Sequence, residues 1–218
     1  MDKLFSLDER LEMCASLVQK SARLVDVGSD HAYLPVWLLK SGKISYAIAS
    51  DINKKPLESG RLTAEKYGAK NIEFRLGSGL CTVTESDNIT DVVIAGMGGE
   101  IISEILLQSP LTKDKMLNII LQPMTKSEEL IDFLYSNGFE IIKQSCVVSK
   151  GKCYTVMAVH YTSEKQTVTE TFKYIGKLDL KDEVNVRFIK AHIKHLENKS
   201  KGDSSLTEVT EKLKKMIQ

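Results

Sequence analysis

The sequence lacks long apolar runs and any marked excess of charge. Nowhere do eighteen apolar residues follow one another, and the first residues, MDKLFSLDERLEMCASLVQ, do not have the architecture of a signal peptide. Thirty basic side chains against twenty-nine acidic ones give a formal charge of +1, which favours no class of charged partner. We therefore expect a cytoplasmic protein without a membrane partner, whose electrostatic contacts are local.

Cysteine is scarce, and the four cysteines form no C-x-x-C pair. They fall in or beside apolar segments, at Cys14, Cys81, Cys146 and Cys153. This spacing favours reduced, buried thiols over a structural metal site, so we expect no metal. A chain of 218 residues with 42% apolar content can bury one substantial core and carry a small appendage.

Short, β-branched and nearly continuous apolar segments recur along the first three quarters of the chain. Such segments are typical of strands that are covered on both faces. Helical patterns separate the first six, which predicts parallel neighbours joined by right-handed crossovers. The expected strands are Leu24–Val27, Tyr46–Asp51, Ile72–Leu76, Asp91–Ala95, Leu117–Gln122, Phe139–Val148 and Tyr154–Tyr161.

Both ends of this pattern carry further information. Residues 7–20 predict a first helix with Ser6 as its N-cap. Only SKGK (149–152) separates the last two strands, which predicts a hairpin and a reversed final strand. The expected fold is α/β, with a Rossmann-like seven-stranded sheet whose last strand is antiparallel.

The composition changes after Tyr161, and lysine becomes frequent. Residues 163–218 carry twelve Lys or Arg against nine Asp or Glu. Val184, Phe188, Ile189, Ile193 and Leu196 trace one helical stripe, and a second consists of Leu206, Val209, Leu213 and Met216. We therefore divide the chain into a sheet domain, 1–162, and a C-terminal helical hairpin, 163–218.

The turn after the first strand has few glycines for a dinucleotide site. Gly28 stands alone where G-x-G-x-x-G would bring bare backbone to a pyrophosphate. Asp51, at the end of the second strand, has the type and position to accept both hydroxyls of an adenosine ribose. Asp26 can orient an ammonium group, where it would repel a phosphate. The pattern therefore indicates an adenosine without phosphates, as in S-adenosylmethionine.

Each of these residues also has a simpler interpretation. Asp26 could brace its turn through backbone N–H groups, and Asp51 could cap the next helix. AGMGGE (95–100) offers a close backbone approach to a flat ligand, or only a tight turn. His31 could contact the cofactor or be structural, and Tyr33 could stack on a base or pack under its helix.

The stretches LVDVGSDHAYLP, VVIAGMGGEII and IILQPM together resemble the bacterial TrmK-type family of tRNA adenine-N1-methyltransferases, which act at tRNA position 22. The resemblance covers nearly the whole chain. It implies a class I methyltransferase fold with strand order 3-2-1-4-5-7-6, S-adenosylmethionine as methyl donor with S-adenosylhomocysteine as product, and a coiled-coil-like C-terminal domain that helps to hold tRNA. The cofactor residues that it implies by matching type are Arg10, Asp26, Gly28, His31, Asp51, Ala95, Gly96 and Met97.

Two positions depart from the family pattern. Ser78 stands in RLGSGL where the family often shows Asp or Asn, and Met124 follows LQP where it shows Asn. A serine hydroxyl can still accept from an adenine amino group, although more weakly. We add Ile52, Ser78 and Gly79 to the candidate cofactor residues.

Transfer to adenine N1 needs positioning rather than a strong base, because the nucleophile is a ring lone pair. An acceptor for the exocyclic N6 amine would polarise the base, and Asp30 and Gln122 are the candidates. Pro123 would shape the pocket, and Tyr33 completes the candidate catalytic set.

We expect tRNA to be the partner of a monomeric protein. The lysines that could follow its phosphates lie in the tail, although an ordinary solvated face would have the same pattern. They are Lys190, Lys194, Lys199, Lys201, Lys212, Lys214 and Lys215. Two alternatives stay open: a methyltransferase with a small-molecule or protein acceptor, and a non-catalytic RNA-binding or nucleotide-binding module.

Overall fold

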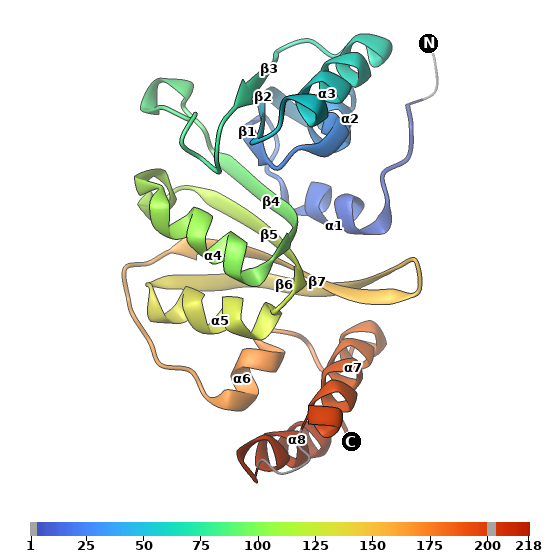
Figure 1. The fold of residues 1–218 in the computed structure, drawn as a ribbon, viewed down its shortest axis with the longest axis vertical. Helices are drawn as coiled ribbons and strands as arrows, with labels where there is room; N and C mark the ends of the chain where they lie inside the picture. Colours follow the sequence, from blue (N-terminus) through green and yellow to red (C-terminus); the bar gives the residue numbers. More distant parts are fainter. Residues whose placement is uncertain (1–3, 200–203) are drawn as a thin grey trace.

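The computed structural model describes residues 4–199 and 204–218, which are built around one twisted sheet (Figure 1). The described residues form a seven-stranded sheet in the order β3-β2-β1-β4-β5-β7-β6. Its strands are β1 (Ala22–Val27), β2 (Ile44–Asp51), β3 (Ile72–Leu76), β4 (Asp91–Gly98), β5 (Asn118–Thr125), β6 (Phe139–Ser149) and β7 (Lys152–Tyr161). β7 is antiparallel to β5 and β6, and the other pairs are parallel. The predicted order and the reversed last strand are confirmed.

Helices cover both faces of the sheet. α1 and α2 pack on one face over β1, β2 and β5, and α4 and α5 pack on the other over β4, β5 and β7. The helices are α1 (Glu9–Leu17), α2 (Tyr33–Lys40), α3 (Lys54–Tyr67), α4 (Gly99–Gln108), α5 (Ser127–Ser136), α6 (Glu170–Ile175), α7 (Glu183–Lys199) and α8 (Ser204–Met216), with short 3-10 helices η1 (Asp30–Ala32), η2 (Glu85–Asp87) and η3 (Pro110–Lys113).

The central strands are apolar on both sides because both sides are buried. Ile119 and Leu121 belong to the core under α4 and α5, while Ile120 between them belongs to the core under α1 and α2. All three are fully buried. This explains why the strands have continuous rather than alternating hydrophobicity.

The first helix begins later than its apolar spacing predicts. α1 starts at Glu9, and its N-cap is Asp8, whose carboxylate accepts a hydrogen bond from the Leu11 N–H at 2.9 Å. The expected cap at Ser6 is therefore wrong. A carboxylate at the N-cap also interacts favourably with the positive end of the helix dipole.

The hairpin between β6 and β7 turns through two residues with left-handed backbone. Lys150 has φ 49° and Gly151 has φ 79°. Two positive φ angles match the right-handed twist of the flanking strands and produce a tight turn. The hairpin expected at SKGK is confirmed, and it brings the start of β7 to the carboxyl end of β5.

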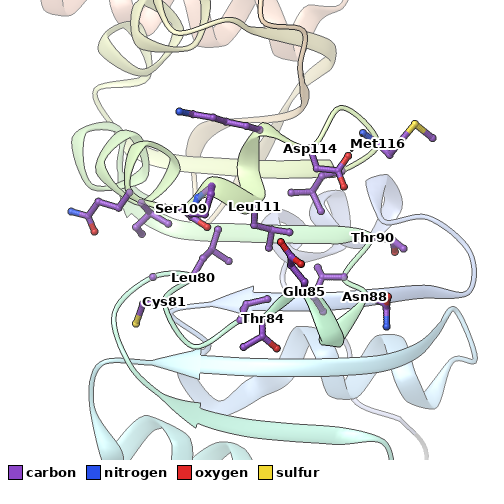
Figure 2. A pocket seen from close by; sticks show the side chains of 18 of the residues that line it. Leu80, Cys81, Thr84, Glu85, Asn88, Thr90, Ser109, Leu111, Asp114 and Met116 are labelled. Atoms are coloured by element: carbon purple, nitrogen blue, oxygen red, sulfur yellow. Dashed lines mark hydrogen bonds between the residues drawn. The ribbon is translucent and has the colours of Figure 1, made fainter.

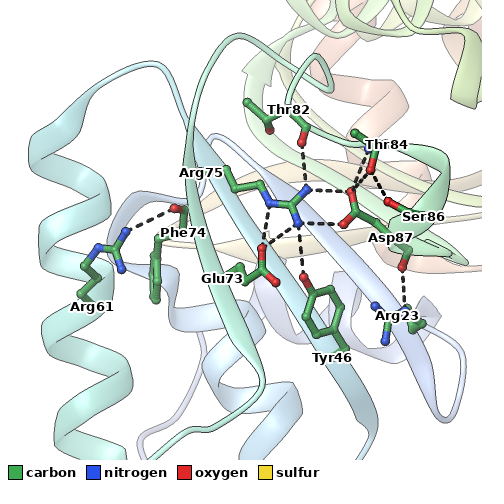
Figure 3. A network of polar contacts seen from close by, with 10 residues as sticks. All are labelled: Arg23, Tyr46, Arg61, Glu73, Phe74, Arg75, Thr82, Thr84, Ser86 and Asp87. Carbon is green, nitrogen blue, oxygen red and sulfur yellow. Dashed lines mark hydrogen bonds and ion pairs between the residues drawn. The ribbon is translucent and has the colours of Figure 1, made fainter.

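The segment between β3 and β4 contains the short η2 in place of a long crossover helix, and Arg75 anchors it (Figure 3). The Arg75 guanidinium forms two 2.7 Å contacts with the Asp87 carboxylate and also donates to the Thr82 carbonyl at 2.8 Å. Glu73 accepts from it at 2.6 Å. This arginine holds the pKa of Asp87 well below its usual range.

The C-terminal helices pack against the β6–β7 hairpin. Cys146 on β6 and Cys153 on β7 belong to the same apolar cluster as Ile189 and Leu213 of α7 and α8. Met216 is half exposed, contrary to the predicted stripe, and Ile217 contacts the cluster in its place. The sequence pattern also missed α6.

Two further expectations concern the chain as a whole. Of the four cysteines, all free thiols, Cys81 is exposed and Cys153 is half-buried, so the prediction of four buried thiols is wrong. Along the described ranges, 4–199 and 204–218, no helix has the length and apolar character to cross a membrane.

Candidate active site

Asp26 lies one residue before the end of β1, between Ala49 of β2 and Val93 of β4. Its side chain is buried and accepts a hydrogen bond from the Ser29 hydroxyl at 2.5 Å. Burial raises the pKa of Asp26 to about 7; the Ser29 hydrogen bond opposes this shift, and the nearby charge of Asp51 adds to it. A carboxyl group that titrates near neutral pH at a strand end is a feature of functional sites.

Gly28 makes the turn after β1 possible. Its φ is +72°, and a Cβ at this position would lie 2.2 Å from Cε of Met97. Its N–H donates to the Ser50 carbonyl at 2.8 Å, which ties the turn to β2. The glycine therefore lets the ends of β1, β2 and β4 approach one another.

The residues after this turn have an uncommon backbone. His31 has φ 58° and Ala32 has φ 52°, both left-handed. Nε2 of His31 lies 3.5 Å from a carboxylate oxygen of Asp30, and the His31 ring stacks on Tyr33 with centroids 5.4 Å apart. The Asp30 side chain is 73% exposed, so it is available to an incoming ligand. Tyr33 also packs edge-on against Phe5.

Asp51 ends β2 in a short side-chain turn, where its carboxylate accepts from the Asn53 N–H at 2.8 Å. α3 begins at Lys54 with Asn53 as its N-cap, so the simpler interpretation of Asp51 as the helix cap is wrong. Ile52 is 67% exposed. An acid and an exposed apolar side chain thus share one turn at the carboxyl edge.

Ser78 and Gly79 follow β3. The Ser50 hydroxyl donates to the Gly79 carbonyl at 3.3 Å, and Ser78 is exposed. Both residues are part of the lining of a cavity of about 800 Å³, and Figure 2 shows this cavity from close by. The rest of that cavity runs under η2, α4 and η3, and Asp26, Asp51 and Gly96 do not line it. This cavity is therefore not the crevice that the sequence predicts.

The end of β4 bulges at Gly96. The pairing of β4 with β5 shifts register between Ala95 and Met97, and Gly96 has φ +81°. A Cβ placed on Gly96 would meet no atom of the described residues within 4 Å, so this backbone faces open space. Such a bulge exposes backbone to a ligand at the carboxyl edge of the sheet.

Arg10 reaches this edge from α1. Its guanidinium donates to the Gln122 amide oxygen at 3.1 Å and the Met124 sulfur at 3.2 Å, and it pairs with Asp8 at 2.8 Å. Its charge also lies 5.5 Å from the Tyr154 ring centroid. The thioether of Met124 thus accepts a hydrogen bond from the same guanidinium as the Gln122 amide.

Gln122 does not have the surroundings expected of a base acceptor. It is fully buried, and its amide oxygen accepts from both Arg10 and the Gly96 N–H, the latter at 3.2 Å. Its amide nitrogen donates to the Pro123 carbonyl at 2.8 Å. In this structure Gln122 positions Arg10 and Gly96, which leaves Asp30 as the exposed candidate acceptor.

The structure therefore gathers most of the predicted site at one edge. Asp26, Gly28, Asp51, Gly96 and Gln122 lie at the carboxyl ends of β1, β2, β4 and β5, where the strand order reverses. Sequence reasoning missed Tyr154, because its contact with Arg10 depends on the register of β7. Within the residues that the structure describes, no three His, Cys, Asp or Glu side chains are grouped to hold a metal ion.

The tail lysines divide into three groups. Lys190, Lys194 and Lys215 are exposed, whereas Lys212 pairs with Glu208, and Lys214 pairs with Glu197 and Glu211. Lys199 ends α7, and Lys201 lies outside the described residues.

Comparison with known proteins gives consistent matches. The family model described as "Methyltransferase domain" matches residues 7–157. The tRNA (adenine(22)-N(1))-methyltransferase of Bacillus subtilis (strain 168) is 37% identical over 157 residues, which are 69% of this chain and 63% of that enzyme. The chain thus spans less than two thirds of this relative's length.

Solved structures are covered more completely. A Streptococcus pneumoniae protein, named as a candidate tRNA (m1A22) methyltransferase, superposes with a TM-score of 0.87 at 31% identity, over 98% of this chain and 100% of that one. M. capricolum TrmK, in complex with S-adenosylhomocysteine, superposes with a TM-score of 0.80 at 25% identity, over 99% of this chain and 98% of that one. The chain therefore belongs to the TrmK-type family of tRNA methyltransferases, within the methyltransferase-domain fold.

Proposed function

We propose that this protein transfers a methyl group from S-adenosylmethionine to N1 of adenosine 22 in tRNA. The observation that carries the proposal is the convergence of Asp26, Asp51 and the Gly96 bulge at the switch point of the sheet. Two carboxylates and one glycine turn suit a phosphate-free nucleoside with an ammonium group. The names of the relatives support the same activity.

The crevice fits this donor in charge and in space. Asp51 can accept hydrogen bonds from ribose hydroxyls. Burial disfavours the charged form of Asp26, and an ammonium group bound next to it would stabilise that form. Open space faces the backbone of Gly96. Arg10, held by Asp8 and Gln122, can reach a carboxylate at the same edge. The remaining candidates, His31, Ile52, Ser78, Gly79, Ala95 and Met97, stay part of the proposal.

When bound, the donor supplies an electrophilic methyl group on a sulfonium. The protein's own residues have to orient the acceptor base and stabilise the charge that the base gains. Asp30 can accept from the exocyclic amine, and its carboxylate also favours the positive charge of an N1-alkylated adenine. Tyr33 and Pro123 would shape the pocket, and Gln122 acts through Arg10 and Gly96.

Methyl incorporation into two tRNA transcripts tests the proposal. One transcript carries adenosine at position 22, and the other is identical but carries guanosine there. We expect incorporation into the first alone. Equal incorporation into both, or into neither while a small molecule or protein accepts methyl groups, would contradict the choice of acceptor. Tight donor binding without turnover on any tRNA would favour a non-catalytic RNA-binding module.

The proposal includes a cytoplasmic monomer that needs no metal ion, with residues 163–218 contributing to tRNA binding. Activity should therefore persist in the presence of a chelator. Size-exclusion chromatography with light scattering should give the mass of one chain, and a dimer mass would contradict this part of the proposal.

A further inference from the structure

A second cavity, of about 410 Å³, opens at the carboxyl end of β5, beside the candidate active site. Its volume is in the range of small-ligand sites. β5 and β7 are antiparallel, with Leu121 opposite Met157, and Met124 from the end of β5 and Tyr154 from the start of β7 both line the cavity. The cavity lies between the sheet and α7, and its lining includes Pro123, Met124, Tyr154, Phe188, His192 and His195.

Tyr154 connects this cavity to the active site. Its ring lies 5.5 Å from the Arg10 guanidinium, and Arg10 in turn contacts Gln122 and Met124. A base that stacks against Tyr154 would therefore affect the position of Arg10, whose contacts order the carboxyl ends of β4 and β5.

The wall formed by α7 offers rings at helical spacing. Phe188, His192 and His195 follow one another at intervals of four and three residues and line the cavity together with Ala191. Phe188 is buried, His192 is half-buried, and Ala191 and His195 are exposed. The His192 ring packs on Phe188 with centroids 4.6 Å apart, and its Nε2 lies 3.5 Å from the Ser127 hydroxyl. Burial lowers the pKa of His192, so this ring presents an uncharged surface at neutral pH. Flat, uncharged rings are the surfaces on which unstacked bases bind.

The charges around the cavity suit a nucleoside that is linked to phosphates outside it. Lys126, Glu128 and Glu129 line one side, and Lys126 pairs with Glu129 at 3.5 Å. This side keeps a net negative charge, which disfavours a phosphate inside the cavity, and the Glu128 carboxylate can accept from base amines. Arg187 and Lys194 lie on the exposed face of α7, and Arg187 donates to the Gly151 carbonyl at 3.3 Å. A wall with a net negative charge and two exposed cations outside the cavity match the polarity of a nucleotide in a chain.

We propose that this cavity receives an unstacked base next to the methylated adenosine, an inference that rests on the proposed function. The methylated base itself belongs nearer the acids, because Asp26, Asp30 and Gly96 do not line the cavity. Holding a neighbouring base offsets part of the cost of extracting adenosine 22 from the folded tRNA.

The variant Ala191→Trp places a large side chain in the cavity from an exposed position. The control, Met116→Trp, introduces the same side chain outside this cavity. Met116 is 82% exposed, at the amino-terminal end of β5 and away from the cavity. We expect Ala191→Trp to lower kcat/KM for tRNA about tenfold or more, the scale of one lost base stack, with unchanged affinity for S-adenosylhomocysteine. His195→Ala should lower kcat/KM for tRNA by a smaller factor, and it tests the same cavity if Ala191→Trp does not fold.

An abasic site on either side of adenosine 22 identifies the occupant. One of the two abasic tRNAs should be methylated about tenfold more slowly by the wild-type protein. The same abasic site should not slow Ala191→Trp further, because the stacking of that base in the cavity is already lost in the variant. Full activity of Ala191→Trp, or equal abasic losses in both proteins, would overturn the inference while the proposed function stands. A wild-type protein that methylates no tRNA would remove both.

Discussion

At the scale of single residues, the site depends on one buried acid whose protonation is balanced near neutral pH. Burial favours the neutral form of Asp26, whereas the proposed ammonium partner favours the charged form. The carboxyl group is therefore destabilising in the free protein and useful in the complex. Such opposition between stability and function is expected at binding sites.

Asp26→Asn tests this balance without changing the size of the side chain. The pKa is about 7 in the folded protein and about 4 in the unfolded chain, so wild-type stability falls as pH rises between these values. The amide does not ionise. We expect the stability of the variant relative to wild type to rise by roughly 2 to 3 kcal/mol between pH 5 and pH 8, from thermal unfolding without ligand.

The same variant should bind S-adenosylhomocysteine at least about tenfold more weakly, because the charge that faces the ammonium group is gone. Parallel stability curves for variant and wild type across this pH range would show that the carboxyl group does not titrate there.

Asp30→Ala separates orientation of the base from binding of the donor. Asp30 is exposed and lies 3.5 Å from the His31 ring, so we expect the fold to tolerate its removal. Single-turnover methyl transfer should slow about 100-fold, with donor affinity unchanged. Asp30→Asn, which keeps an acceptor but loses the charge, should be intermediate. Near-normal transfer by the alanine variant would remove Asp30 from the active site.

At the scale of elements, the segment after β3 depends on a charged side chain rather than on a helix. Arg75 connects the β3 strand to Asp87 in η2 through two parallel hydrogen bonds, with the Tyr46 hydroxyl 3.5 Å away (Figure 3). Ser78 and Gly79 begin this segment, so its anchoring also fixes two candidate cofactor residues.

Arg75→Met should destabilise the protein by about 3 kcal/mol or more, because Asp87 is then a mostly buried charge without its cation. Glu73→Gln is the matched control and should cost less than about 1 kcal/mol, since Glu73 is half exposed. Urea unfolding at pH 7 measures both.

The pH dependence follows from the lowered pKa of Asp87. The stability that this pair contributes is present above about pH 4 and is lost as pH falls further. The difference in stability between wild type and Arg75→Met should therefore shrink as pH falls below about 4. Equal destabilisation by the two variants would contradict the anchoring role.

The strands were predictable from the sequence, whereas contacts between distant side chains were not. Val92–Ile94 and Ile119–Leu121 are continuous apolar runs in which β-branched residues predominate, so their strands were predictable from hydrophobicity alone. The pairing of Arg10 with Gln122 was not, because it joins residues 112 positions apart through side-chain geometry. Tyr154 and the exposed Cys81 were missed for the same reason: their environment comes from strands and loops that meet only in the folded chain.

At the scale of the whole molecule, the C-terminal helices are packed on the last two strands rather than freely linked. Ile189 is fully buried in a cluster that includes Cys146 of β6, and Asn185 accepts from the Cys146 N–H at 2.9 Å. α7 therefore has a fixed position beside the carboxyl edge of β5 (Figure 1). RNA that contacts α7 would reach the site in a defined orientation.

Lys190→Ala combined with Lys194→Ala tests RNA binding by α7. Both lysines are exposed, one turn apart. We expect weaker tRNA binding and a salt dependence of log K that is shallower by about 2, close to one for each lost phosphate contact. The control removes Lys113 and Lys115, which are exposed before β5, and should leave the slope unchanged. An unchanged slope in the α7 variant would assign its lysines to an ordinary solvated face.

The most direct measurement is a calorimetric titration of the protein with S-adenosylhomocysteine and, separately, with NAD under the same conditions. We expect S-adenosylhomocysteine to bind, Asp51→Ala to weaken this binding at least about tenfold, and NAD to give no binding heat. Binding of NAD without binding of S-adenosylhomocysteine would contradict the central claim that two carboxylates and a single glycine turn select a phosphate-free nucleoside.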